Sequence, residues 1–276
     1  MKLLLLLLCC LLLPVAAVAH PLPYAVASAP TPVYNSPQAA ASNTPPPTDR
    51  CGQVRQLEWI AFAGTPFTVV AETILNRQSV LEVTSPSYRP PPGVHLFVAA
   101  SGLKRRASLP PLPTPAPLSA EELLQRLRSA IGLPYVWGGN LRQGIPFGQM
   151  RFFVGLDCSG LLYEATDGAT PRNTADLVSY GQAVPVAGLT LDQLLNRLEP
   201  LDLIVWKGHV VIVADKGQAI ESLLVCDQVG NGGVRLTPLR QRLREIMTTR
   251  QGVDSWPKQH GTQQLFVVRR WLPLAD

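Results

Sequence analysis

Three polar residues in the second half of the sequence have the types and the spacing of a thiol-based site for acyl chemistry. Cys158 lies within Gly-Leu-Asp-Cys-Ser-Gly, where a helix is predicted to begin, and the positive end of a helix favours the nucleophilic thiolate. His209 opens an apolar run that predicts a central strand, so its imidazole could pair with the thiolate and later protonate a leaving amine. Glu221 is predicted on the next strand, beyond a turn at 215–217, where a carboxylate would orient the His209 ring.

Each of these residues has a more ordinary interpretation when it is taken alone. A single buried cysteine is usually inert, a single histidine on a strand is usually packed or solvated, and Glu221 fits an exposed strand position. A metal site made of Cys158, His209 and Cys226 is disfavoured, because neither the cysteines nor the histidines are paired at ligand spacing. The combination of thiol, imidazole and carboxylate therefore predicts catalysis without a metal and without a cofactor.

The elements that would position these residues are predicted between 119 and 276. A capping box at 119–122 begins a helix that Gly132 ends, and a second helix is predicted at 158–166. Extended runs are predicted at 203–206, 209–214, 218–224 and 265–271. Helices followed by strands at hairpin spacing predict an α+β fold with an antiparallel sheet.

The first half of the chain has a different composition, because 18 of the 27 prolines lie between His20 and Ser119. Each internal proline removes a backbone donor, so this part cannot be mostly helical. Short strands are predicted at 24–26, 32–34, 57–62, 66–70, 79–83 and 95–98, with 57–62 and 66–70 flanking a turn at Gly64. Their spacing predicts a small barrel or sandwich over 20–106. Residues 107–118 are predicted to form an extended polyproline linker that holds two domains at a defined separation.

Residues 1–19 have the pattern of a secretory signal. Lys2 precedes eleven apolar residues, and Ala-Val-Ala at 17–19 offers a cleavage site between small residues. The apolar run is too short to span a bilayer comfortably, so a retained membrane anchor is the less favoured alternative. We expect the mature protein to begin near His20, to be secreted or periplasmic, and to contain no integral membrane segment.

Export would leave three cysteines, Cys51, Cys158 and Cys226, and an odd number leaves at least one of them unpaired within the chain. A disulfide between Cys51 and Cys226 with Cys158 free is one possibility. Burial of all three as small hydrophobic residues is another. Spacing alone does not decide between them.

The composition places the chain among globular proteins, with 46% apolar and 16% charged residues. The formal net charge of +5 is mild and suits an anionic polymer such as cell wall, and no aromatic and basic stripe argues for nucleic acid. Most of the late arginines, between Arg235 and Arg250, are expected on the solvated face of a short helix after Pro238.

Several motifs, taken together, resemble those of the NlpC-type cell-wall cysteine peptidases, a papain-like family also named after a sixty-kilodalton secreted bacterial protein. They are Pro-Tyr-Val-Trp-Gly-Gly at 134–139, Leu-Asp-Cys-Ser-Gly at 156–160, Pro-Arg-Asn-Thr at 171–174, Leu-Asp-Leu-Ile-Val-Trp at 201–206 and Gly-His-Val-Val-Ile-Val at 208–213. The resemblance covers 119–276. The front half, 20–106, more loosely resembles the bacterial SH3-like barrel found ahead of many such enzymes.

The resemblance implies hydrolysis of peptidoglycan stem peptides, or of muropeptides carrying them, between γ-D-glutamate and a diamino acid such as diaminopimelate. By that analogy Cys158 is the nucleophile, His209 the base and acid, and Glu221 the residue that orients His209. The remaining expected residues line the oxyanion and substrate groove: Tyr135, Asp157, Ser159 and Asn173. Tyr135 would donate to the developing oxyanion, although a half-buried structural aromatic fits its place equally well.

Two departures from the family pattern leave questions open. The third catalytic position is more often His, Asn or Gln than Glu, and relatives that trim free stem peptides carry Asp where Asn173 stands. Polymeric wall and released peptide therefore both stay open as substrates. A wall-binding protein with a decayed site, and an amidase or acyltransferase on the same fold, are the alternative functions. The diamino acid and the oligomeric state are not predicted.

Overall fold

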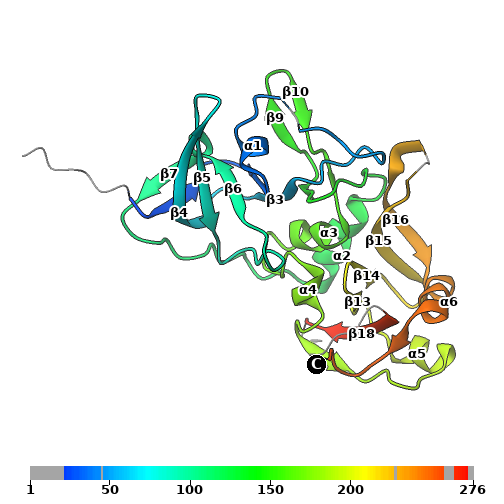
Figure 1. Ribbon diagram of the computed structural model, residues 1–276. Helices are drawn as coiled ribbons and strands as arrows, with labels where there is room; N and C mark the ends of the chain where they lie inside the picture. The colour runs from blue at the N-terminus through cyan, green and yellow to red at the C-terminus, as the bar shows by residue number, and fades with distance from the viewer. Residues whose placement is uncertain (1–21, 45, 227–228, 258–263, 273–276) are drawn as a thin grey trace, which may run out of the picture.

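The computed structural model describes residues 22–44, 46–226, 229–257 and 264–272, so the predicted signal segment lies outside the described residues. The chain forms two halves that lie side by side (Figure 1). The first half is built on one sheet, and the second half packs helices on another. In the described ranges, no helix has the length and apolar character needed to cross a membrane.

The front half is a seven-stranded sheet with strand order β3-β2-β6-β5-β4-β1-β7. Its strands are β1 (Tyr24–Ala27), β2 (Thr31–Tyr34), β3 (Leu57–Ala61), β4 (Pro66–Leu75), β5 (Gln78–Thr84), β6 (Leu96–Ala99) and β7 (Leu103–Arg106), with short helical turns α1 (Pro37–Ala40) and η1 (Ala100–Gly102). Trp59 and Phe67 are fully buried in its core, and Trp59 stacks on Tyr88. Within the described residues β3 and β7 remain open edges, so the expected SH3-like barrel is not confirmed.

The predicted strands of the front half all form, but the partners of two of them differ from the expected hairpin. β3 and β4 are joined through Gly64, which adopts φ +88° as a turn requires. They do not pair with each other, because β3 pairs with β2 while β4 pairs with β1 and β5. A turn signal identifies a change of direction, whereas pairing depends on strands far away in the sequence.

The second half has the predicted helices and antiparallel sheet. Its helices are α2 (Ala120–Ser129), α3 (Cys158–Ala165), α4 (Thr174–Leu177), α5 (Leu191–Arg197) and α6 (Leu239–Thr249), with a short turn η2 (Val229–Asn231). Two small strand pairs lie between α2 and α3, one nested inside the other: β8 (Asn140–Leu141) pairs with β11 (Gly155–Leu156), and between them β9 (Ile145–Phe147) pairs with β10 (Met150–Phe152). The main sheet, in the order β12-β18-β13-β14-β15-β16, contains β12 (Gln182–Val184), β13 (Leu203–Trp206), β14 (His209–Val213), β15 (Gln218–Leu224), β16 (Gly232–Pro238) and β18 (Leu265–Arg270).

The main sheet is covered by helices on both faces. Alternate residues of the central strands contribute to two different apolar clusters, as the two-residue period of a strand requires. Helices α2 and α3 pack on one face, and α5 and α6 on the other. All of its pairings are antiparallel except that of the short strand β17 (Gln251–Gly252) with β18. The α+β prediction is confirmed for this half.

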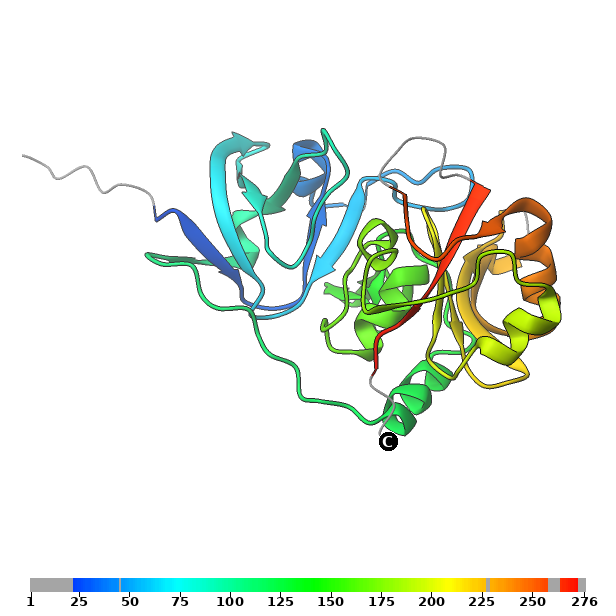
Figure 2. The ribbon, with the colours of Figure 1, turned by 90° about the horizontal axis from the view of Figure 1, so that it is seen from below.

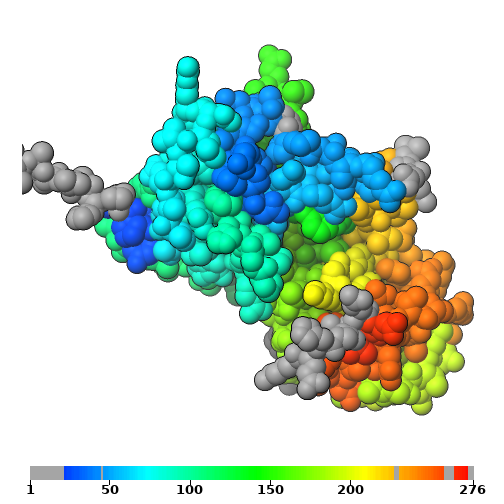
Figure 3. Space-filling view, in the orientation of Figure 1, coloured from blue at the N-terminus to red at the C-terminus, as the bar shows by residue number. Residues whose placement is uncertain are grey.

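The two halves are joined by more than the linker. A disulfide links Cys51 to Cys226, and the buried Asn140 side chain exchanges two hydrogen bonds with the backbone of Ile60, at 2.8 and 2.9 Å. Figure 3 shows the segment that follows α1 lying across the second half, and Figure 2 shows the extended linker running from the first sheet to α2. The linker therefore connects two bodies that are already fixed by direct contact, and does not act as a spacer between them.

Candidate active site

Cys158 is the first residue of α3, and the residues around it are fixed by hydrogen bonds to the start of that helix. Asp157 is the N-cap, and its Oδ1 accepts from the backbone N–H of Gly160 at 2.7 Å. Gly160 is needed here because an added Cβ would lie 1.9 Å from the carbonyl oxygen of Gly139. The thiol thus lies at the positive end of a helix packed tightly against the 134–139 loop.

A buried arginine completes this arrangement. The Arg172 guanidinium is 2% exposed and donates to both carboxylate oxygens of Asp157, at 3.0 and 2.6 Å. It also donates to the Ser159 hydroxyl at 2.9 Å. A bidentate ion pair of this kind fixes the orientation of the two side chains as well as the distance between them. Asp157 and Ser159, the neighbours of Cys158 in the sequence, are therefore held in place.

His209 and Glu221 come together as the hairpin prediction requires. β14 and β15 pair antiparallel, and His209 Nε2 lies 2.8 Å from Glu221 Oε2. Cys158 Sγ lies 3.8 Å from the carbonyl oxygen of Gly208, the residue before His209. The three residues that the sequence predicts as a catalytic set are therefore brought to one place in the structure.

The charges of this set stabilise one another. Burial works against a charged imidazole, but the hydrogen bonds and charges of Cys158 and Glu221 outweigh it and raise the pKa of His209 to about 9. Burial likewise opposes ionisation of Glu221, yet His209 and Arg242 lower its pKa to about 2. At neutral pH the site therefore holds an imidazolium next to an ionised carboxylate.

Arg242, on α6, is a second arginine that contacts a carboxylate of the site. Its Nε and Nη2 donate to Glu221 Oε2 at 3.1 and 2.9 Å, and its Nη1 donates to Glu245 at 3.2 Å. Arg235 and the Thr237 hydroxyl approach the other oxygen, Oε1, of Glu221. The expected helix after Pro238 forms, but Arg242 is turned inward and does not belong to a solvated face.

Tyr135 lies beside the thiol at the edge of the same cavity. Burial, assisted by the negative charges of Asp157 and Cys158, raises the pKa of Tyr135 above its ordinary value. The phenol accordingly keeps its proton and is a hydrogen-bond donor at all working pH values. Its surroundings suit a group that donates to a developing oxyanion.

The cavity at Cys158 is a cleft of about 670 Å³ that both halves of the molecule line. The second half contributes Tyr135, Asp157, Cys158, Ser159, Arg172 and Asn173, among others. The first half contributes Glu58, Tyr88 and the run 89–92. The cleft is thus lined in part by a segment that is distant from Cys158 in the sequence.

Asn173 is the point where the two sides of the cleft meet. Its Nδ2 donates to the carbonyl oxygen of Arg89, the residue after Tyr88, at 2.7 Å. The Tyr88 hydroxyl also donates to Glu58 at 2.5 Å, and Glu58 accepts a further bond from Asn35 at 2.7 Å. This network holds a half-buried carboxylate, that of Glu58, within the cleft.

The residues that sequence reasoning did not single out are Arg172, Arg242, Glu58 and Tyr88. Arg172 lies within the Pro-Arg-Asn-Thr motif, so the motif carried a signal although only its Asn173 was selected. Arg242 appeared as one member of an arginine cluster. Glu58 and Tyr88 carry no local signal, because their place in the cleft depends on how the two halves dock.

Comparison with known proteins gives relatives of one kind. The chain is 27% identical over 122 residues to a γ-D-glutamyl-L-lysine dipeptidyl-peptidase of Bacillus subtilis, covering 40% of this chain and 38% of that protein. It is 31% identical over 139 residues to the peptidoglycan endopeptidase RipB of Mycobacterium tuberculosis, covering 46% of this chain and 54% of that one. The chain therefore spans about half the length, or less, of these relatives. No known protein-family profile matches it.

Comparison with solved structures gives matches with low TM-scores. The structure of the peptidoglycan hydrolase RipB matches with 26% identity and a TM-score of 0.34, over 56% of this chain and 65% of that one. An NlpC/P60 family protein from Bacillus cereus matches with 18% identity and a TM-score of 0.33, over 91% of this chain and 63% of that one. The curated relatives of this chain are thus a γ-D-glutamyl-L-lysine dipeptidyl-peptidase and a peptidoglycan endopeptidase.

Proposed function

We propose that the protein is a cysteine peptidase that hydrolyses the stem peptides of peptidoglycan. The observation that carries the proposal is that Cys158, at the start of α3 and in a cleft of about 670 Å³, lies next to the hydrogen-bonded pair of His209 and Glu221. The names of the relatives, a γ-D-glutamyl-L-lysine dipeptidyl-peptidase and a peptidoglycan endopeptidase, support the choice of substrate.

The residues around Cys158 support a two-step reaction. In the first step the Cys158 thiolate forms a bond to the carbonyl carbon, and the imidazolium of His209 gives its proton to the amine nitrogen as the C–N bond breaks. In the second step neutral His209 takes a proton from water, the resulting hydroxide attacks the thioester, and the acid product leaves. Thiolate and imidazolium are then restored. Tyr135 is the donor proposed for the oxyanion of both steps.

We propose further that the bond cleaved is the one between γ-D-glutamate and a diamino acid, and that short released peptides are preferred over intact wall. The support is that the front half contributes Glu58, Tyr88 and the run 89–92 to the lining of the cleft. The Glu58 carboxylate would attract a cationic group such as a free amino end. It supplies the negative charge that Asn173 lacks.

Replacement of Cys158 tests the catalytic proposal. Wild-type protein is expected to release diamino-acid peptides from purified muropeptides, and Cys158→Ala is expected to lose this activity entirely while its unfolding transition is unchanged. Ser129→Ala, which changes an exposed hydroxyl at the end of α2, is the matched control. Mass spectrometry of the products identifies the bond and separates hydrolysis from acyl transfer. Release by Cys158→Ala at the wild-type rate would contradict the proposal.

The same assay compares sizes of substrate. Purified sacculi and free stem peptides are digested side by side, and a preference for free peptides with an unblocked amino end is expected. Equal rates on free and amino-acetylated peptides would exclude recognition of the amino end.

Tight binding to sacculi with a thiol inert toward iodoacetamide would favour the wall-binding alternative. Cys158 is the one free cysteine within the described residues, so alkylation reports on it directly once the signal is removed.

We also propose that the protein is exported and that its mature form begins near His20. The signal-like segment 1–19 supports this, and so does the Cys51–Cys226 disulfide, because such bonds persist in oxidising compartments. Sequencing of the amino terminus of protein recovered from the cell envelope tests it. An amino terminus at Met1 in protein from the cytosol would contradict it.

A further inference from the structure

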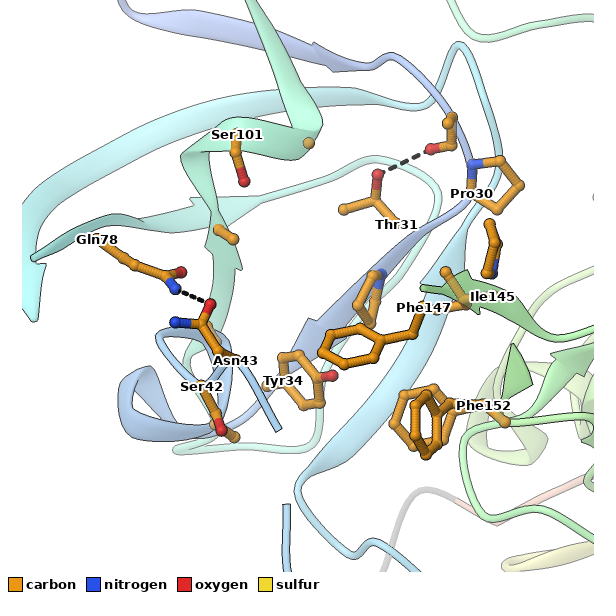
Figure 4. Close-up of a pocket in the computed structure, with 18 of the residues that line it drawn as sticks. Pro30, Thr31, Tyr34, Ser42, Asn43, Gln78, Ser101, Ile145, Phe147 and Phe152 are labelled. Atoms are coloured by element: carbon orange, nitrogen blue, oxygen red, sulfur yellow. Dashed lines mark hydrogen bonds between the residues drawn. The ribbon is translucent and has the colours of Figure 1, made fainter. Parts of the chain in front are cut away.

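A second cavity lies away from Cys158, between the front sheet and the β9–β10 strand pair. It has a volume of about 450 Å³ and shares no lining residue with the Cys158 cleft. Figure 4 shows the rings of Tyr34, Phe147 and Phe152 gathered on one side of the hollow, with Asn43 and Gln78 on the other. We call this the β9–β10 cavity.

The aromatic side of the β9–β10 cavity is held in place by ring contacts. Phe147 packs edge-on against Phe152 with ring centroids 5.3 Å apart, and Tyr34 packs edge-on against Phe153 at 6.4 Å. Phe153 has φ +56°, a left-handed conformation that bulky residues rarely adopt. Phe147 nevertheless remains 45% exposed, so an aromatic face is offered to solvent on a supported hairpin.

The polar side consists of neutral hydrogen-bonding groups. Gln78 donates to the Asn43 carbonyl oxygen, which leaves the Asn43 amide nitrogen and the Gln78 carbonyl oxygen as a further donor and acceptor among the described residues. The Thr31 hydroxyl donates to the Ala29 carbonyl at 2.7 Å, so its oxygen can still accept from a ligand. Ser42 and Ser101 add two more hydroxyls to the lining.

None of the described residues that line the β9–β10 cavity carries a charge at neutral pH, since Tyr34 is the only titratable one and burial raises its pKa. The Cys158 cleft differs, because Glu58, Arg89, Asp157, Arg172 and Lys207 all line it. A charged stem peptide would gain no opposite charge in the β9–β10 cavity and would lose solvation there. Its ligand should be neutral, with one apolar face and several hydroxyl or amide groups.

We propose that the β9–β10 cavity binds an N-acetylated sugar ring of the peptidoglycan glycan strand. The C–H face of a pyranose is apolar and slightly positive, which suits the negative face of an aromatic ring such as Phe147. Its acetamido group and hydroxyls suit the amides of Asn43 and Gln78. The choice of a peptidoglycan sugar rests on the proposed function. The match between the cavity and a neutral ring with one apolar face rests on the residues that line the cavity.

Binding of a peptide-free sugar tests this inference. The β-1,4-linked tetramer of N-acetylglucosamine is titrated into the full mature protein and followed by calorimetry or by NMR. Saturable one-site binding is expected with a dissociation constant of about 1 mM or tighter. Phe147→Ala is expected to weaken binding by about tenfold. Met150→Ala, on the same strand pair but outside the lining, is the matched control and is expected to bind like the wild type.

The outcomes separate this inference from the proposed function. Cys158→Ala should bind the tetramer as the wild type does, and Phe147→Ala should cleave sugar-free stem peptides at the wild-type rate. The inference is overturned if the wild type shows no saturation up to about 10 mM sugar, well beyond the expected range. It is also overturned if Phe147→Ala and wild type bind equally, or if a proline-rich peptide, which prefers aromatic grooves, binds and displaces the sugar.

Discussion

Asp157, next to Cys158 in the sequence, and Glu221, next to His209 in the structure, are both buried carboxylates paired with an arginine, but they contact different groups. Asp157 gives one oxygen to Gly160 and both oxygens to Arg172, so its bonds end within the framework around α3. Glu221 shares a single oxygen, Oε2, between His209 and Arg242. The first pair positions the thiol without touching it, whereas the second acts directly on the imidazole.

The charge pair of Asp157 and Arg172 therefore has a structural role, whereas the pair of Glu221 and Arg242 acts on the protonation of His209. Removing one partner from a buried pair leaves an uncompensated charge wherever it occurs. At Asp157 the consequence should be mainly loss of stability and misplacement of Cys158. At Glu221 it should be mainly a change in the pKa of His209, since that carboxylate helps to raise it. Variants of the Asp157 pair should therefore differ from the wild type mainly in stability, and variants of the Glu221 pair mainly in the pH dependence of activity.

The largest effect is expected from Arg172→Met, which leaves Asp157 buried and without its cation. The free energy of unfolding should fall by about 3–5 kcal/mol, and activity should fall with it because the start of α3 loses its support. Urea denaturation followed by circular dichroism measures the first effect. Arg126→Met is the matched control, because Arg126 pairs with Asp167 at the surface and the change should cost about 1 kcal/mol or less.

The double variant Asp157→Asn with Arg172→Met sharpens this prediction. Removing both charges also removes the uncompensated one, so part of the stability lost in Arg172→Met should return. If Arg172→Met loses no more stability than Arg126→Met, the structural role assigned to this pair is wrong.

The helix start at Cys158 and the pairing of His209 with Glu221 were predictable from sequence, because the contacts that position these proposed catalytic residues are local or belong to one hairpin. The helix that begins at Cys158 and the hairpin that joins His209 to Glu221 each follow from a short pattern. Arg172 lies within the Pro-Arg-Asn-Thr motif, but the motif does not show that this loop arginine turns inward to a helix N-cap. Its burial becomes understandable only once the 134–139 loop, α3 and the loop before α4 are packed together.

The front half shows the same limit on a larger scale. Its strands were predicted by local propensity, but the pairing of β3 with β2, and not with β4, depends on the complete sheet. The place of Glu58 in the cleft depends further on the docking of the two halves. That docking rests on contacts between distant segments, such as Cys51 with Cys226 and Ile60 with Asn140.

A smaller effect, on activity rather than on stability, is expected from Glu221→Gln. The amide oxygen can still accept from His209, but the negative charge that supports the imidazolium is lost, so kcat/KM should fall by about 10²-fold. The pKa of His209 should also fall below about 9. Since the imidazolium is the proton donor, the activity of the wild type should be lost as the pH rises through about 9. The activity of Glu221→Gln should be lost at a lower pH. The measurement is kcat/KM on a stem peptide as a function of pH.

Glu245→Gln is the matched control for this variant. Glu245 also contacts Arg242, at 3.2 Å, but lies on the exposed side of α6 and does not touch His209. Its pH profile should match that of the wild type. An unchanged alkaline limit in Glu221→Gln would show that Glu221 does not set the charge of the imidazole.

The smallest effect is expected from Arg242→Met, since Arg242 acts on His209 only through Glu221. The pKa of Glu221, about 2, should rise because a neighbouring cation is gone. The contribution of this ionised carboxylate to stability is present above its unfolded pKa and is lost as the pH falls through its folded value. Both the acid unfolding of the variant and the acid limit of its kcat/KM should therefore begin at a higher pH, with only a few-fold loss of activity at neutral pH.

Arg240→Met on the same helix separates this role from a general loss of charge. Arg240 forms an exposed ion pair with Asp192 at 2.7 Å, which should contribute about 1 kcal/mol or less. Arg242→Lys, which keeps the charge but loses the paired donors, should restore the acid limit in part. If Arg240→Met and Arg242→Met shift the acid limit equally, the shift reflects net charge, and Arg242 is no positioning residue. If only Arg242→Met shifts the acid limit, Arg242 acts on the titration of the site through Glu221. Its removal then changes the pH dependence of activity at little cost to the stability of the fold.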